Sequence, residues 1–142
     1  MKTGKDVLTS LLKTTQMGQV GIRSVLDTSM QPGIRKALES QLREYDTIET
    51  EAHSLASQRG WELKELDPAV RMMSDMMTRM KLVGHDTDSR IADMMIQGNT
   101  KGMIKSLKDL HRFTGNDERV LTLSQKLLDC ENANIRQMQE YL

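Results

Sequence analysis

Residues 67–84 read DPAVRMMSDMMTRMKLVG, and this Met-rich stretch separates two long regions with helical apolar spacing. Asp67 is a favoured N-cap, and Pro68 suits a first helical turn because the N–H that proline lacks would be unpaired there. The stretch therefore predicts a short helix that begins at Pro68 and ends near Gly84. Its place between two longer regions makes it a crossover rather than a member of either.

The region before the crossover predicts two long helices. Thr3 and Asp6 have the spacing of a capping box, and apolar residues then recur every three or four positions over residues 4–27. Pro32 suits the first turn of a second helix, which Gly60 ends. The short break between these helices predicts an antiparallel hairpin.

The region after the crossover predicts a second hairpin. Its first helix starts at a cap supplied by Asp86 or Thr87 and ends near Phe113, and the last helix is capped by Asn116. The expected apolar face of the first of these helices consists of Ile91, Met94, Met95, Gly98, Ile104, Leu107 and Leu110.

Residues 97–102 (QGNTKG) allow two interpretations. Two glycines and an asparagine inside a helix cost about 2 kcal/mol relative to good helix formers, which favours a loop. Apolar spacing resumes afterwards, and Gly98 and Gly102 share one helix face where another helix can approach closely. We favour the helix, and a phosphate-binding loop is disfavoured because Gly102 is followed by Met103 instead of Lys.

No segment alternates with period two, so the predicted fold class is all-α. Four helices of about 22 to 27 residues are the usual material of a four-helix bundle, and two hairpins joined by one long connection form one of its known topologies. The chain has 142 residues, which predicts a single domain over residues 1–142.

Two short strings echo each other between the halves: TQMG at residues 15–18 and IQGN at residues 96–99. With these strings, the run MMIQGNT at residues 94–100 and the paired hairpins, the chain resembles the ferritin-like superfamily over nearly its whole length, especially small bacterial members. The resemblance implies a ferritin-like bundle with a crossover helix. In di-iron members, two helices each supply a Glu and the other two each supply Glu-x-x-His.

The residues at the corresponding positions depart from that ligand set. Amides stand where the first and fourth helices would offer carboxylates, and Asn and Ala stand where the two histidines would be. Hard divalent metals prefer charged oxygen and imidazole ligands, so we expect no di-iron centre and no cofactor. We predict instead a buried hydrogen-bonded network of Gln16, Tyr45, Glu49, Gln97, Glu131 and Asn134.

Other chemistry has weaker support in the sequence. Glu49 and His53 share a helix face and, with Glu131, are the candidates for a rearranged metal site; an exposed polar contact of His53 is the interpretation that we favour. A small-ligand cavity beside Gln16 and Gln97 is a further alternative. Cys130 lies between two acidic residues, which raise the pKa of a thiol and disfavour a nucleophile. No catalytic motif appears, and we expect no enzyme.

The methionines of the crossover helix cover two adjacent stripes, which one surface cannot bury together. We expect packing against the bundle and against a second subunit, with packing inside one chain or Cu(I) binding by thioethers as alternatives. The predicted subunit interface consists of Val70, Met72, Met73, Met76, Met77 and Met80.

Charge and composition limit the partners. Lys and Arg number 20 and Asp and Glu also number 20, so the broad basic surface of a nucleic-acid-binding protein is not expected. One cysteine fits a reducing compartment, and neither a membrane-spanning run nor a signal peptide is apparent. We therefore expect a cytoplasmic homodimer that acts as a structural or interaction module, with a metal-binding protein as the alternative; a different protein partner stays open.

Overall fold

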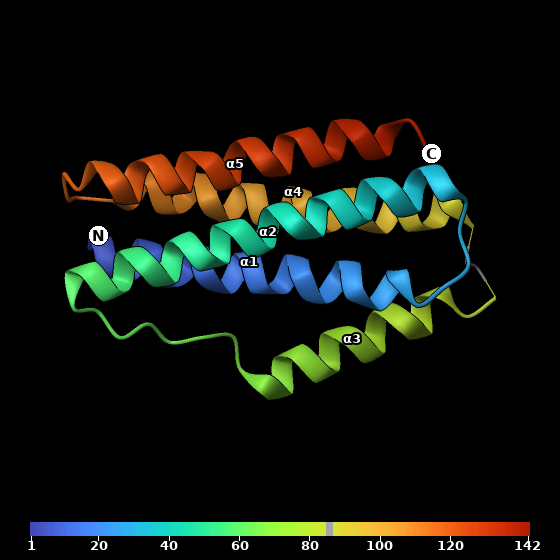
Figure 1. Cartoon of the computed structure of the whole chain (residues 1–142), viewed down its shortest axis with the longest axis horizontal. Coiled ribbons are helices and arrows are strands. Elements are labelled where there is room, and N and C mark those ends of the chain that lie inside the picture. Colours follow the sequence, from blue (N-terminus) through green and yellow to red (C-terminus); the bar gives the residue numbers. More distant parts are fainter. Residues whose placement is uncertain (85–86) are drawn as a thin grey trace.

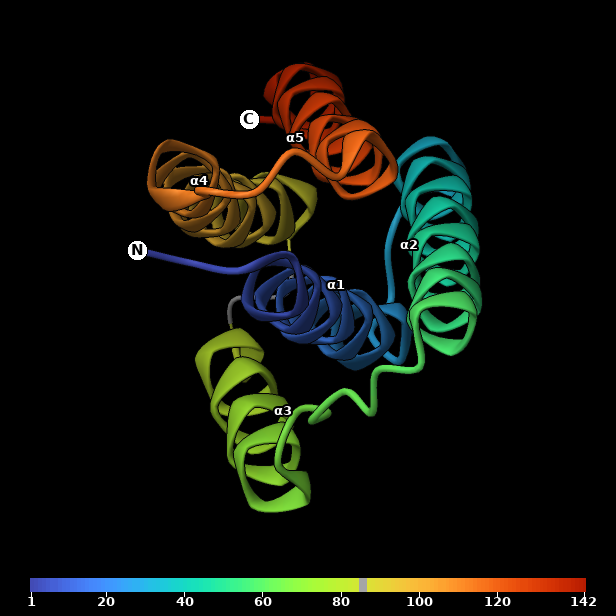
Figure 2. The same cartoon turned by 90° about the vertical axis from the view of Figure 1, so that its left-hand side faces the viewer.

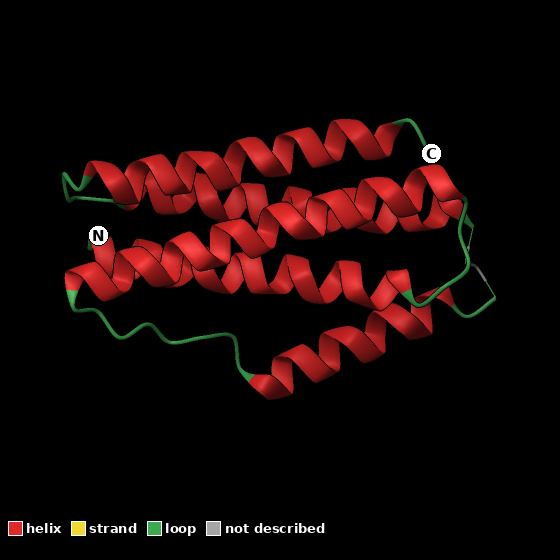
Figure 3. Ribbon diagram, viewed as in Figure 1, coloured by secondary structure: helices red, strands yellow, loops and turns green. Residues whose placement is uncertain are grey.

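A computed structural model describes residues 1–84 and 87–142, and it is all-α over this part of the chain, as predicted. The described residues form five helices and no strand, and Figures 1 and 3 show their arrangement. The helices are α1 (Gly4–Leu26), α2 (Pro32–Arg59), α3 (Pro68–Leu82), α4 (Asp88–Arg112) and α5 (Glu118–Gln139). None of them is long and apolar enough to cross a membrane, within the described residues.

The helix ends follow the expected capping chemistry with one exception. Thr3 and Asp6 form the capping box, and Gly60 ends α2 in the left-handed conformation, with φ of 69°. The predicted cap at Asn116 is wrong: the side chain of Asp117 caps α5 instead, because it accepts from two backbone N–H groups of the first turn. Thr87 caps α4, whereas the alternative cap Asp86 lies outside the described residues.

Four helices surround a shared apolar core. Viewed along the helices in Figure 2, α1 lies beside α2 and α4, and α5 lies beside the same two helices. Figure 1 shows that α1 and α5 run in one direction and that α2 and α4 run in the other. The crossover between the two hairpins runs from the end of α2, through α3, to the start of α4.

The core is built from the apolar stripes of the four long helices. Leu8 and Leu12 of α1, Leu38 of α2, Ile91 of α4 and Leu127 of α5 are at most 1% exposed. Truncating such a side chain to Ala costs about 2–5 kcal/mol, since the cavity closes only in part.

Helix α4 is continuous through residues 97–102, so the helical interpretation of this segment is confirmed. Its predicted apolar face is wrong in the second half: Ile104 is 47% exposed and Leu107 is 37% exposed, whereas Asn99, Ser106 and Asp109 are buried. Polar partners explain the difference, because Asp109 accepts a hydrogen bond from Ser10 and Ser106 donates to Glu131.

The N-terminal segment is held against the turn between α4 and α5. The backbone N–H of Lys2 donates to the carbonyl oxygen of Arg112 over 2.9 Å, and the N–H of Thr114 donates to the carbonyl oxygen of Lys2 over 3.1 Å. The Lys2 ammonium also lies 2.7 Å from a carboxylate oxygen of Asp109. The first residues of the chain are therefore paired with residues more than a hundred positions away.

Helix α3 lies outside the four-helix core and packs on α1 (Figure 2). Leu82 is its only buried residue. Two polar contacts join α3 to α1 and to its C-cap: Ser24 donates to Asp75 over 2.5 Å, and the Arg79 guanidinium lies 2.5 Å from a carboxylate oxygen of Asp27. Apart from Leu82, the helix thus turns a polar side towards the bundle. Its methionines are exposed, so the two methionine stripes do not pack inside one chain.

Candidate functional site

The six residues of the predicted polar network fall into two groups and one outlier. The first group lies between α1 and α2. Gln16, which is 1% exposed, donates through Nε2 to Glu49 Oε2 over 3.0 Å, and its Oε1 accepts from the backbone N–H of Leu66 over 2.8 Å. Gln19 donates to the other oxygen of Glu49 over 3.2 Å. The α1 amides therefore fix a carboxylate of α2 and the connection that follows it.

The charge state of Glu49 follows from these contacts. Burial alone raises the pKa of this carboxyl group, but hydrogen bonds from Gln16 and Gln19 and the neighbouring His53 and Arg71 outweigh it, and the pKa lies below its ordinary value. Glu49 is thus an anion at neutral pH.

Gln97 is the outlier. Its side chain is exposed, and its Nε2 donates to Asp93 Oδ1 one turn earlier on the same helix, over 2.8 Å. The buried amide of α4 is Asn99 instead, two positions further along the chain. Because two positions turn a side chain to a different side of a helix, Gln97 is not part of the buried network.

The second group lies where α2, α4 and α5 meet. The Tyr45 hydroxyl donates to Asn99 Oδ1 over 2.8 Å and lies 3.5 Å from the donating Nδ2 of Asn134. Burial, and then the nearby Glu131, raise the pKa of Tyr45 far above its ordinary value, so the phenol stays protonated. Tyr45, Asn99 and Asn134 are thus buried, neutral groups that hydrogen-bond to one another.

Glu131 has the most perturbed carboxyl group of the described residues. It is 1% exposed, and its Oε1 accepts from the Ser106 hydroxyl over 3.3 Å. Burial raises its pKa to about 8, and the Ser106 hydrogen bond only partly opposes this shift. Glu131 is therefore a neutral acid at pH 7, which is the opposite of what a hard metal ion requires.

Within residues 1–84 and 87–142, one group of side chains brings three metal-ligating atoms together. Glu49, His53 and Glu65 each offer an atom within 4.8 Å of the other two, and His53 Nε2 lies 3.2 Å from Glu65 Oε1. Glu131 lies outside this group, and Glu65 takes the third position. Sequence reasoning missed Glu65 because it lies in the connection after α2, where no helical spacing links it to His53.

A pocket of about 380 Å³ opens between α1 and α4, close to the second group. Neither Gln16 nor Gln97 lines it, so the ligand cavity predicted beside those amides is wrong in its residues. Its polar lining includes Tyr45, Asn99 and Glu131, together with three lysines and a threonine: Lys13, Lys101, Lys105 and Thr14.

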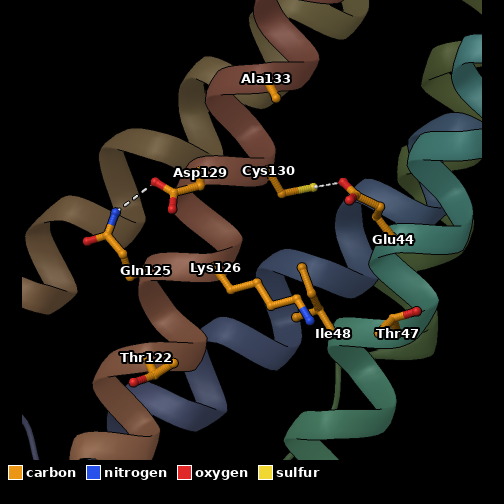
Figure 4. Close-up of a pocket in the computed structure, with 9 residues that line it drawn as sticks. All are labelled: Glu44, Thr47, Ile48, Thr122, Gln125, Lys126, Asp129, Cys130 and Ala133. Atoms are coloured by element: carbon orange, nitrogen blue, oxygen red, sulfur yellow. Dashed lines mark hydrogen bonds between the residues drawn. The ribbon is translucent and has the colours of Figure 1, made fainter.

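A larger groove, of about 610 Å³, lies between α2 and α5 (Figure 4). Cys130 of α5 and Glu44 of α2 point towards each other across it, and the thiol donates to Glu44 Oε2 over 3.2 Å. Burial and this carboxylate raise the pKa of Cys130 to about 12. The thiol therefore stays protonated, and a nucleophilic cysteine in this groove is disfavoured.

The predicted interface residues form one exposed surface on α3. We call it the methionine face. The five methionines are 51–69% exposed and Val70 is 43% exposed. The methionine face consists of Val70, Met72, Met73, Met76, Met77 and Met80.

Comparisons of the chain with protein-family models, with curated proteins and with solved structures gave no match.

Proposed function

We propose that this chain is a non-catalytic, ferritin-like helical bundle that acts in protein–protein interaction through the methionine face of α3. One observation carries the proposal: α3 buries Leu82 and makes polar contacts with α1, but it leaves six apolar side chains exposed to solvent. These contacts hold α3 on the bundle, but in an isolated chain the apolar area of the methionine face stays in water, and a partner that covered it would bury that area.

The chemistry of the face suits an interface. Contiguous apolar patches of more than a few hundred Å² are uncommon on monomeric proteins and mark interaction sites. Methionine is unbranched and polarisable, so a face built from it adapts to the shape of a partner. The charged side chains of Arg79 and Asp75 pair with each other over 2.9 Å and also contact Asp27 and Ser24. They are therefore not needed for contact with a partner.

We assign a second copy of the chain as the partner. In a two-fold dimer the same patch meets itself, so the patch must be complementary to itself. The six side chains of the methionine face carry no charge, and two such faces meet without like-charge repulsion. A charged partner surface gains nothing from this face.

The ferritin-like part of the proposal rests on topology and on the site. The direction pattern of the four long helices and the single long crossover are those expected of ferritin-like bundles. At the positions where di-iron members hold metal, Glu131 is protonated and Glu49 accepts hydrogen bonds from the side-chain amides of Gln16 and Gln19. This composition supports a structural role over metal chemistry.

Light scattering coupled to size-exclusion chromatography tests the proposal. We expect the wild type to elute with twice the chain mass, and the Met72→Lys/Met76→Lys variant to elute with the mass of one chain. Met17→Lys is the matched control, since Met17 is an exposed methionine on α1 and outside the methionine face. A monomeric wild type contradicts the proposed dimer.

Metal binding at Glu49, His53 and Glu65 is a second candidate function, favoured by the convergence of their ligand atoms within 4.8 Å. One imidazole and two carboxylates suit Zn²⁺ or Mn²⁺. Titration calorimetry with each ion, on the wild type and on His53→Ala, tests it, with His111→Ala as the control. The candidate fails if binding is absent or if His53→Ala binds as tightly as the wild type.

A further inference from the structure

The pocket between α1 and α4 owes its space to glycines. Gly18 and Gly21 of α1 face Gly98 and Gly102 of α4 in its lining, and its volume of about 380 Å³ lies within the ~300–1,000 Å³ of small-molecule sites. Figure 2 shows α1 and α4 side by side, on a side of α1 different from the one that α3 covers. Glycine is disfavoured in helix interiors, so four on facing helices need a reason.

These glycines do two different things. A Cβ atom at Gly18 would lie 2.7 Å from the Tyr45 ring, and one at Gly102 would overlap Glu131 Oε2, so these two positions let buried side chains reach the pocket floor. A Cβ atom at Gly98 would meet nothing within 4 Å, and one at Gly21 would meet only Met95 at 3.9 Å. Gly98 and Gly21 therefore border open space that no side chain of this protein fills.

The floor of the pocket holds a carboxyl oxygen with no partner. Glu131 is 1% exposed, and its Oε1 accepts from Ser106. Its Oε2 lies against Gly102 and has no hydrogen-bond partner among the described residues. Among the described residues the fully buried side-chain atoms without a partner are Gln41 Oε1 and Ser124 Oγ, so Glu131 Oε2 is instead open to the pocket. A ligand hydroxyl or carbonyl oxygen placed there would form a hydrogen bond with it.

The rim of the pocket is cationic and its walls are apolar. Lys13, Lys101 and Lys105 line it, and none of the three forms an ion pair with an acid in the described part of the chain. Glu131, at the floor, is the only acid among the described residues that line the pocket. Apolar side chains such as Ile22 supply most of the wall.

We propose that this pocket binds a small amphipathic organic anion, with its carboxylate at Lys13, Lys101 and Lys105, its apolar body between the glycines, and a hydroxyl or carbonyl oxygen at Glu131. The lysines supply the charge complement, the glycines supply the room for the apolar body, and the unpartnered Oε2 supplies the polar contact at the buried end. The site is independent of the methionine face and of the metal candidate, because it shares no residue with either.

Three probes of equal chain length separate these contributions: 8-hydroxyoctanoate, octanoate, which lacks the hydroxyl group, and 1,8-octanediol, which lacks the charge. Binding is followed by chemical-shift changes of the Gly21, Gly98 and Gly102 amides in ¹H–¹⁵N spectra. We expect saturable shifts at these amides, with 8-hydroxyoctanoate binding most tightly. Shifts confined to residues 72–80, or no saturable shift with either anion, overturn the proposal.

Variants test the site itself. Gly98 lines the pocket, and a Cβ atom there would meet nothing within 4 Å, so we expect Gly98→Leu to fold, to place its side chain in the pocket and to lose binding of both anions. Ala133→Leu, at an exposed position of α5 outside this pocket, is the matched control and should bind as the wild type does. Retained binding by Gly98→Leu overturns the proposal.

The charge requirement has its own test. Replacing both Lys101 and Lys105 by Gln should lower the affinity for both anions about tenfold at low salt and leave the affinity for the diol unchanged. Lys108→Gln, an exposed lysine of the same helix that does not line the pocket, is the control. If the variant loses as much affinity for the diol as for the anions, or loses no affinity for the anions, the assignment of the carboxylate to the lysines is overturned.

Discussion

Replacing Glu131 by Gln should stabilise the protein in neutral and alkaline solution. The folded-state pKa of Glu131 is about 8, against an ordinary value of 4.5. Between these values the folded chain keeps a proton that the unfolded chain has released. The favourable contribution of this group is therefore complete below pH 4.5, declines as the pH rises and is lost above pH 8.

The size of the effect follows from the shift. One pKa unit corresponds to about 1.4 kcal/mol, so Glu131 should cost the wild type about 3 kcal/mol at pH 7 and about 5 kcal/mol above pH 8, relative to its contribution below pH 4.5. A Gln side chain has nearly the same volume and keeps an acceptor for Ser106, but it does not titrate. The variant should therefore lack this pH dependence.

Urea unfolding followed by far-UV circular dichroism at pH 5, 7 and 8.5 measures the difference. We expect the free energy of unfolding of the wild type to fall by about 4 kcal/mol more than that of Glu131→Gln between pH 5 and 8.5. Glu39→Gln, an exposed position of α2, is the control and should follow the wild type. Parallel pH profiles, or a Gln variant less stable than the wild type at pH 8.5, would refute the reasoning.

Three further predictions concern packing and reactivity. Gly18→Ala should lower the free energy of unfolding by about 1–3 kcal/mol in urea titrations, because its methyl group would press on the Tyr45 ring; an unchanged midpoint would contradict this contact. Cys130 should react with a thiol reagent such as DTNB at pH 8 only when the chain unfolds, since its pKa is about 12, and reaction without urea would be the contrary result. Asp75→Ala should loosen α3 by removing the acceptor of Ser24, and limited proteolysis should then cut inside α3 faster than in the wild type; equal cleavage rates would show that other contacts hold the helix.

The helix ends could be predicted from the sequence because capping is local. Thr3 with Asp6, Asp67 before Pro68, and Gly60 each act within one helical turn, and the chemistry of that turn decides them. The cap of α5 was displaced by one residue because Asn116 and Asp117 are both good caps. Neighbouring candidates of similar quality are decided by geometry and not by residue type.

The rotation of a helix about its axis was harder to predict. The echo between the two halves favoured Gln97 as the buried amide, but the structure buries Asn99, whose Oδ1 accepts from Tyr45 of another helix. In α4 the apolar spacing is interrupted by glycines, so no continuous stripe fixed the buried side. Long-range polar partners such as Ser10 for Asp109 then decided it, and they are invisible in one sequence without pairing information.

The sequence did not reveal the complete candidate metal group, but it did reveal the methionine face. Glu65 has no periodic relation to His53, so only the folded path of the connection brings them together. The methionines were recognised as an unusual surface from their spacing alone, but the polar inner side of α3 was missed. It depends on Ser24 of α1 and on Asp27, the residue that follows α1.

The pairing of Lys2 with the turn after α4 has a consequence for how the chain folds during synthesis. Lys2 can form its backbone hydrogen bonds only after Arg112 and Thr114 have been made, and the inner face of the first hairpin is covered only after α4 and α5 have been made. Contacts between residues so far apart in sequence slow folding and leave apolar surface open in the meantime. A nascent chain stopped before α4 would therefore expose the apolar inner faces of α1 and α2.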